Sequence, residues 1–62
     1  MYEKYAALRD KKGVTDYFVA KSTGIPKSTF SDWKSKKYQP KADKLKLLAD
    51  FFGVTVDFFV SE

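Results

Sequence analysis

The chain has 62 residues, a net charge of +4 and eleven aromatic residues, and it contains neither cysteine nor histidine. Without these side chains there is no disulfide, thiol nucleophile, imidazole base or Cys/His metal site, so we expect no enzyme, no metal and no cofactor. The longest apolar run is four residues, which excludes a membrane span, and the polar N-terminus is no secretion signal. We expect a cytoplasmic protein that forms one domain over residues 1–62.

Apolar residues recur at helical spacing from the start of the chain. They predict a helix over about 2–12, with Tyr5 and Leu8 facing inward and Gly13 ending the helix. The sequence has no alternating strand pattern of useful length, no internal repeat and no low-complexity linker. It therefore predicts an all-α fold, a compact bundle of five helices in which aromatic side chains supply much of the buried area.

A second helix is predicted to begin after Thr15, whose hydroxyl suits the N-cap position. Asp16 complements the positive end of the helix dipole at the first turn. Val19 and Ala20 are the expected core residues of this helix. Gly24 follows and can adopt the positive φ of a tight turn at little steric cost. The pattern indicates two short helices joined by a sharp turn.

The third predicted helix, about 26–35, has two contrasting sides. At roughly 100° per residue, Phe30 and Trp33 fall together on one side, where we expect Trp33 to anchor the helix in the core. The opposite side is small and polar and carries Lys27, Ser28, Ser31, Asp32 and Ser35. Small hydroxyls allow close approach to another surface and can bond to the edges of nucleobases. A solvated helix that is merely rich in serine is the simpler alternative.

A loop over 36–40 ends the third helix, because Pro40 cannot continue it. The fourth helix is predicted over about 41–52, and its core-facing residues are Leu45, Leu48, Ala49 and Phe52. Thr55 is the expected N-cap of a short last helix, whose apolar residues are Val56, Phe59 and Val60.

The positive charge is concentrated in one segment. Seven lysines stand against two aspartates between Pro26 and Lys46, whereas the rest of the chain has a small negative excess. A localised basic field attracts the phosphate backbone of nucleic acids. A solvated, lysine-rich loop is the alternative interpretation.

Residues 15–35, TDYFVAKSTGIPKSTFSDWKS, resemble the helix-turn-helix of the lambda-repressor-like (XRE) family of phage and bacterial transcriptional regulators. Residues 8–15 resemble the first helix of that family and its exit. Residues 41–60 resemble its fourth and fifth helices, with the usual Gly-Val pair at 53–54. The similarity covers about 8–60. It implies that the helix over 26–35 is the recognition helix, which enters the major groove of DNA.

The resemblance implies base contacts from the recognition helix: Lys27, Ser28, Thr29, Ser31 and Asp32. Lys27 and Ser28 stand at the end that enters the groove, and a lysine there suits the O6 and N7 acceptors of guanine. Asp32 would either accept from a cytosine amino group or pair with Lys36 four residues later. Thr29 borders the buried side, so its contact would be peripheral.

The far end of the same helix is expected to hold DNA phosphates, which fix docking without reading sequence. The predicted phosphate contacts are Ser35, Lys36, Lys37 and Tyr38. Lys36 and Lys37 would otherwise be plain loop charges.

Four positions depart from the family pattern. Asp16 replaces a glutamine that donates to a phosphate, and its charge would repel one unless water bridges them. Arg9 usually pairs with a glutamate, but Lys34 occupies that position, so the ion pair is lost or rebuilt elsewhere. Thr23 replaces an apolar residue before the turn. Lys36 replaces a glycine, at a strain of about 1 kcal/mol if its backbone is left-handed.

The leading prediction is a repressor that binds a specific double-stranded DNA operator and occludes a promoter. Because one helix reads only a few base pairs, we expect a homodimer on a palindromic site. Phe58 and Phe59 are adjacent and cannot easily both be buried, so we expect one to extend the core while the other lies exposed. This pair is the candidate dimer surface.

The alternative function is a protein-interaction module, antirepressor or antitoxin-like, with no salt-sensitive DNA affinity. The end of the chain directly after the last predicted helix suits either a small complete regulator or the N-terminal domain of a longer one.

Overall fold

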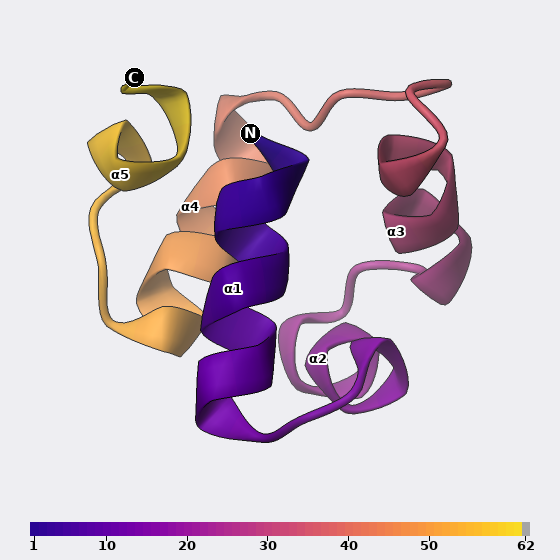
Figure 1. Cartoon of the computed structure of the whole chain (residues 1–62), viewed down its shortest axis with the longest axis horizontal. Coiled ribbons are helices and arrows are strands. Elements are labelled where there is room, and N and C mark those ends of the chain that lie inside the picture. The colour runs from indigo at the N-terminus through magenta and orange to yellow at the C-terminus, as the bar shows by residue number, and fades with distance from the viewer. Residues whose placement is uncertain (62) are drawn as a thin grey trace.

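The computed structural model describes residues 1–61, and five helices occur in that range (Figure 1). They are α1 (Tyr2–Lys12), α2 (Asp16–Thr23), α3 (Lys27–Lys34), α4 (Ala42–Phe52) and α5 (Val56–Val60). The all-α prediction is confirmed, and each predicted boundary agrees to about one residue. None of these helices has the length and apolar character needed to cross a membrane.

The helices form two sides of a small bundle. In Figure 1, α1 runs through the middle of the molecule with α4 beside it, while α2 and α3 lie together to the right. α5 packs on both α1 and α4, and α2 contacts both α3 and α4. The segment from α3 to α4 passes over the top of the view. α3 therefore lies at one margin of the molecule.

Local hydrogen bonds explain why α2 begins and ends where it does. The Thr15 hydroxyl accepts from the backbone N–H of Phe18 at 3.1 Å, which is the predicted N-cap. Gly24 takes a left-handed conformation with φ 81°, and its N–H donates to the carbonyl of Ala20 at 2.9 Å. A side chain at this position would be strained in that conformation, which accounts for the glycine.

Thr23 contributes two hydrogen bonds where the family usually has an apolar residue. Its hydroxyl donates to the carbonyl of Val19 at 2.8 Å and accepts from the N–H of Ile25 at 3.3 Å. Both bonds satisfy backbone groups around the turn, while Ile25 itself is buried. The departure at Thr23 is therefore compatible with an ordered turn.

Tyr5 joins α1 to α3 at the centre of the core. Its ring stacks on Phe30, with centroids 4.9 Å apart, and on Trp33, with centroids 5.3 Å apart. Both partners belong to α3 and both are buried, so the predicted anchoring role of Trp33 is confirmed. The buried hydrophobic residues of the core are Tyr5, Val19, Ile25, Phe30, Trp33, Leu45, Leu48, Ala49 and Phe59.

Phe58 and Phe59 divide as expected, one in the core and one exposed. Phe59 is 1 % exposed and belongs to the core, which removes it from the candidate dimer surface; its neighbour Phe58 is the exposed member of the pair. Val60, the last residue of α5, is 51 % exposed. Consecutive helical residues differ by about 100° in direction, and Phe59 takes the inward one. Three predicted core residues are only partly buried: Leu8, Ala20 and Phe52.

Candidate nucleic-acid interface

The burial of Phe30 and Trp33 fixes which side of α3 faces outward. Four of the predicted base-contacting residues are exposed on that side: Lys27, Ser28, Ser31 and Asp32. Thr29 is partly buried, as expected for a residue at the border. The outward projection of these side chains is confirmed, and their contact with bases stays a prediction.

α3 begins directly after Pro26, and no side chain caps its first turn. The N–H of Thr29 donates to the carbonyl of Pro26 at 3.0 Å, and the N–H groups of this turn form the positive end of the helix dipole. Lys27 and Ser28 are exposed at this same end. The start of α3 therefore combines a cation, a hydroxyl and backbone donors, a set that suits an electronegative ligand.

The far end of α3 closes with a left-handed residue. Lys36 has φ 67°, and its N–H donates to the carbonyl of Trp33 at 3.1 Å. The next two N–H groups, from Lys37 and Tyr38, donate to the carbonyl of Asp32 at 2.8 and 3.3 Å. This is the conformation that usually selects glycine, so the predicted departure at Lys36 is confirmed as a strained position.

A groove of about 400 Å³ lies between the start of α1 and the segment after α3. Three lysines contribute to its wall on the α3 side, and the wall there comprises Trp33, Lys34, Lys36, Lys37, Tyr38 and Gln39. On the opposite wall, Tyr2 packs edge-on against Trp33 with centroids 5.5 Å apart. Three of the four predicted phosphate contacts, Lys36, Lys37 and Tyr38, thus line this groove.

The alternative role of Asp32 is not realised in residues 1–61. The ion pairs formed in this range do not include one between Asp32 and Lys36. The backbone carbonyl of Asp32 also accepts from the hydroxyl of Ser35 at 3.2 Å. The exposed Asp32 carboxylate is thus available to a ligand, whereas the Ser35 hydroxyl is already used within the helix end.

The start of α2 carries a neutralised acid. Nη1 of Arg9 donates to Oδ1 of Asp16 at 3.0 Å, and the hydroxyl of Tyr5 donates to the same oxygen at 2.6 Å. The Arg9 ion pair, which Lys34 cannot form, is therefore rebuilt with Asp16. The hydrogen bond from Arg9 to Asp16 raises the pKa of Arg9. Burial, followed by the hydrogen bond from the Tyr5 hydroxyl to Asp16, raises the pKa of Tyr5. The guanidinium reduces the repulsion that Asp16 would exert on a phosphate.

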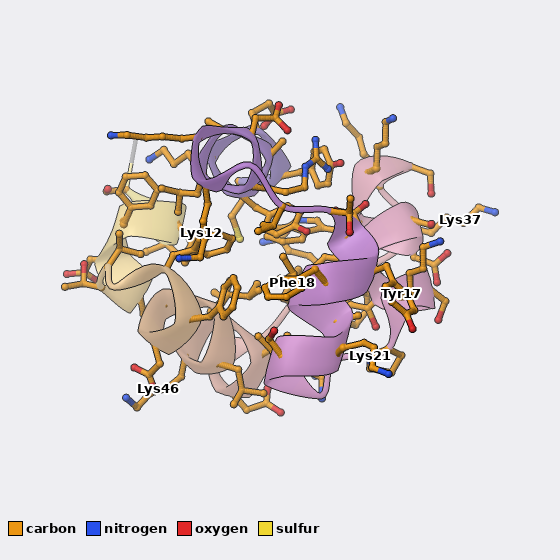
Figure 2. All side chains as sticks on the ribbon, turned by 90° about the horizontal axis from the view of Figure 1, so that it is seen from below. Lys12, Tyr17, Phe18, Lys21, Lys37 and Lys46 are labelled. Atoms are coloured by element: carbon orange, nitrogen blue, oxygen red, sulfur yellow. The ribbon has the colours of Figure 1, made fainter. Side chains whose placement is uncertain are left out.

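The predicted basic segment does not form a single surface. Figure 2 shows Lys37 at the α3 margin and Lys46 on α4, at opposite sides of the molecule. The ammonium of Lys46 pairs with Asp50 at 3.3 Å. Lys46 therefore does not belong to the surface around α3, although it lies within the same run of lysines in the sequence.

Two residues of α2 that lie beside α3 were not among the predicted site residues. Figure 2 shows Tyr17 and Lys21 on the side of α2 nearer α3, and the Lys21 ammonium lies 5.6 Å from the Tyr17 ring centroid. Both side chains are exposed. Their spacing of four residues, on the side away from Val19, was the available signal.

A helix-turn-helix family model matches residues 6–59, almost the whole chain. The chain belongs to the XRE-type helix-turn-helix family. It is 34% identical over 59 residues to the HTH-type transcriptional activator BcrR of Enterococcus faecalis. That alignment covers 95% of this chain and 29% of the relative, so the chain spans less than a third of the relative's length. No solved structure gives a significant match. The family assigns the domain to DNA binding in transcription regulation.

Proposed function

We propose that the chain reads a specific sequence in double-stranded DNA by placing α3 in the major groove, as a bacterial or phage transcriptional regulator. The observation that carries the proposal is the outward side of α3, where small hydroxyls and one lysine are exposed opposite the anchors Phe30 and Trp33. Such a side allows the helix backbone to approach base edges closely.

Each exposed side chain of α3 has a chemical role in this proposal. Lys27 donates to the O6 and N7 acceptors of guanine, and Asp32 accepts from a cytosine amino group. Ser28 and Ser31, which lie between Lys27 and Asp32 in the sequence, bond to base edges. Thr29 makes a peripheral contact from the border of the buried side. The unpaired state of the Asp32 carboxylate in residues 1–61 supports its assignment.

Phosphate contacts from the end of α3 and the following turn set the register on DNA. We assign them to Ser35, Lys36, Lys37 and Tyr38, all of which are exposed. For Ser35 the contact uses its backbone or a rotated hydroxyl, since the hydroxyl bonds to Asp32 in the free protein. Tyr17 and Lys21 extend the same side from α2 and add a further donor and cation (Figure 2).

Two copies are proposed to bind a palindromic operator, because one α3 reads too few base pairs for a unique address. Phe58 and Val60 expose apolar side chains on α5, and they are the proposed contact between the copies.

Occupancy of such an operator represses any promoter that it overlaps, and we propose repression by occlusion as the direct consequence of DNA binding. The relative is named an activator, and activation requires a protein-binding surface in addition to the DNA-binding one. The two outcomes share the same α3 interface.

Selection of bound sites from random duplexes tests the proposal. We expect one enriched motif with two-fold symmetry and half-sites about one helical turn apart. We also expect an affinity that falls steeply with salt, since lysine contacts release counterions from phosphates. Uniform recovery of all sequences would contradict sequence-specific reading, and the absence of any salt-sensitive binding would favour the protein-interaction module.

A further inference from the structure

An apolar surface lies where α2 meets α4, away from the DNA-binding side of α3. Phe18 is 50 % exposed, and Figure 2 shows it directed from α2 toward α4, while Tyr17 points to the other side. Its ring centroid lies 6.2 Å from that of Phe51. Leu47, 41 % exposed, stands one turn before Phe51 on α4. We call Phe18, Leu47 and Phe51 the α2–α4 surface.

The bundle core does not require these exposed side chains. The enclosed core contains none of the three residues, and Phe51 only packs against its edge. Single exposed apolar residues are normal in proteins, whereas adjacent ones from two elements mark a site of contact with another molecule. The α2–α4 surface is of the second kind, because Phe18 and Phe51 touch across two helices.

A lysine borders this surface. The ammonium of Lys12 lies 5.3 Å from the Phe51 ring centroid. Two nearby acids are already paired, Asp16 with Arg9 and Asp50 with Lys46. Asp43 is exposed one turn before Leu47, at the end of the surface farther from Phe51 along α4.

The apolar centre and its positive border together restrict which kind of molecule can bind the α2–α4 surface. A second copy of the chain would bring its own Lys12 and a net charge of +4 against the same border, which opposes self-association here. The charged phosphates of a DNA backbone do not complement the apolar side chains of Phe18 and Leu47. A protein segment that carries carboxylates around apolar side chains complements both features.

We propose that the α2–α4 surface binds an acidic amphipathic segment of another protein, with a carboxylate at Lys12 and apolar side chains on Phe18, Leu47 and Phe51. This surface and the exposed side of α3 are separate, so a regulator bound to DNA through α3 can hold the partner at the same time. Such a contact is what activation of transcription requires.

The test uses ¹⁵N-labelled protein and a synthetic acidic helix as the probe. The peptide carries leucine and phenylalanine at helical spacing (i, i+3, i+4, i+7) and glutamate elsewhere, and a control peptide replaces every glutamate with lysine. We expect saturable shifts of amide signals in residues 12–22 and 44–54 with the acidic peptide only. Phe18→Ser and Leu47→Ser should each weaken binding about tenfold, whereas Ala7→Ser, at an exposed apolar position on α1, should not.

A charge exchange sharpens the test. Lys12→Glu should weaken the acidic peptide and strengthen the lysine peptide. Equal binding of both peptides, no effect of Phe18→Ser, or shifts confined to residues 27–38 would overturn the proposal, and the last result would indicate simple attraction to the lysines near α3. Circular dichroism of each variant separates loss of binding from loss of folding.

The same titration, repeated with protein saturated by a selected duplex, separates this proposal from the DNA-binding one. We expect peptide affinity to be retained within about twofold. Displacement of the peptide by DNA would overturn simultaneous binding. Failure of the chain to select any duplex would instead contradict the proposed function and leave the peptide result standing.

Discussion

Arg9 of α1 and Asp16 of α2 form an ion pair with a separation of 3.0 Å, and the buried Tyr5 bonds to the same carboxylate oxygen. Two departures from the family pattern, an arginine without its usual glutamate and an acid in place of a glutamine, therefore compensate each other. The pair ties the start of α2 to α1, while the Tyr5 ring ties α1 to α3. This cluster thus links both helices of the motif to α1.

Removing Arg9 should destabilise the fold. Arg9→Ala leaves the partly buried Asp16 carboxylate with only the Tyr5 hydroxyl, so we expect the free energy of unfolding to fall by about 1–3 kcal/mol. Urea unfolding followed by circular dichroism measures the change. Lys11→Ala is the control, since Lys11 is exposed on the same helix. An equal effect of the two substitutions would show that the ion pair is dispensable.

Stability should decline in alkaline solution because of Tyr5. Burial, followed by the bond to Asp16, raises the pKa of folded Tyr5 above its ordinary value of 10.0. In the unfolded chain Tyr5 loses its proton near pH 10, so its contribution is fully present below that pH and is lost as pH rises further. The added slope approaches about 1.4 kcal/mol per pH unit.

Comparison with Tyr5→Phe isolates this contribution. The lysines titrate in both proteins, so the difference in unfolding free energy between about pH 9 and pH 11 reports Tyr5. Parallel pH profiles for the two proteins would contradict the raised pKa.

Lys36→Gly should stabilise the protein and weaken its binding to DNA. Glycine relieves the left-handed strain at φ 67°, so we expect a gain of about 1 kcal/mol in thermal or urea unfolding. The same change removes one proposed phosphate contact, which should lower the salt slope of binding by about 0.9. Lys37→Gly should show the second effect without the first. A loss of stability in Lys36→Gly would contradict the strain.

Substitutions should distinguish the residues that contact bases from those that contact phosphates. Lys27→Ala or Ser28→Ala should relax preference at one or two base pairs, by about 1–3 kcal/mol of discrimination per lost bidentate contact. Lys37→Ala should weaken binding to every duplex by a similar factor. Competition binding with a selected site and a random duplex measures both effects.

Lys46→Ala is the matched control for these substitutions, because Lys46 lies across the molecule and pairs with Asp50 (Figure 2). It should change neither affinity nor preference. Equal losses on selected and random DNA for Lys27→Ala would show that Lys27 contacts only phosphate.

Features set by neighbours in the chain were predictable. Thr15 as an N-cap, the turn at Gly24 and the left-handed Lys36 each depend on a few consecutive residues, and all three were predicted from sequence and confirmed. The rotation of α3 followed from two aromatic residues three apart, Phe30 and Trp33.

Features that depend on the placement of one helix against another were not predictable. Arg9 and Asp16 are seven residues apart with a turn between them, and their pairing requires the angle between α1 and α2. The position of Lys46 on the far side, and of Tyr17 beside α3, depends likewise on how α2 and α4 pack. The five residues of α5 give too short a pattern to fix which of Phe58 and Phe59 faces inward.

The position of Trp33 gives the chain a built-in optical probe. It is the only tryptophan, it belongs to α3, and it is enclosed against the ring of Tyr5. Any motion that separates α3 from α1 would expose the indole to water and shift its fluorescence to longer wavelength. The attachment of α3 can therefore be followed in real time without a label.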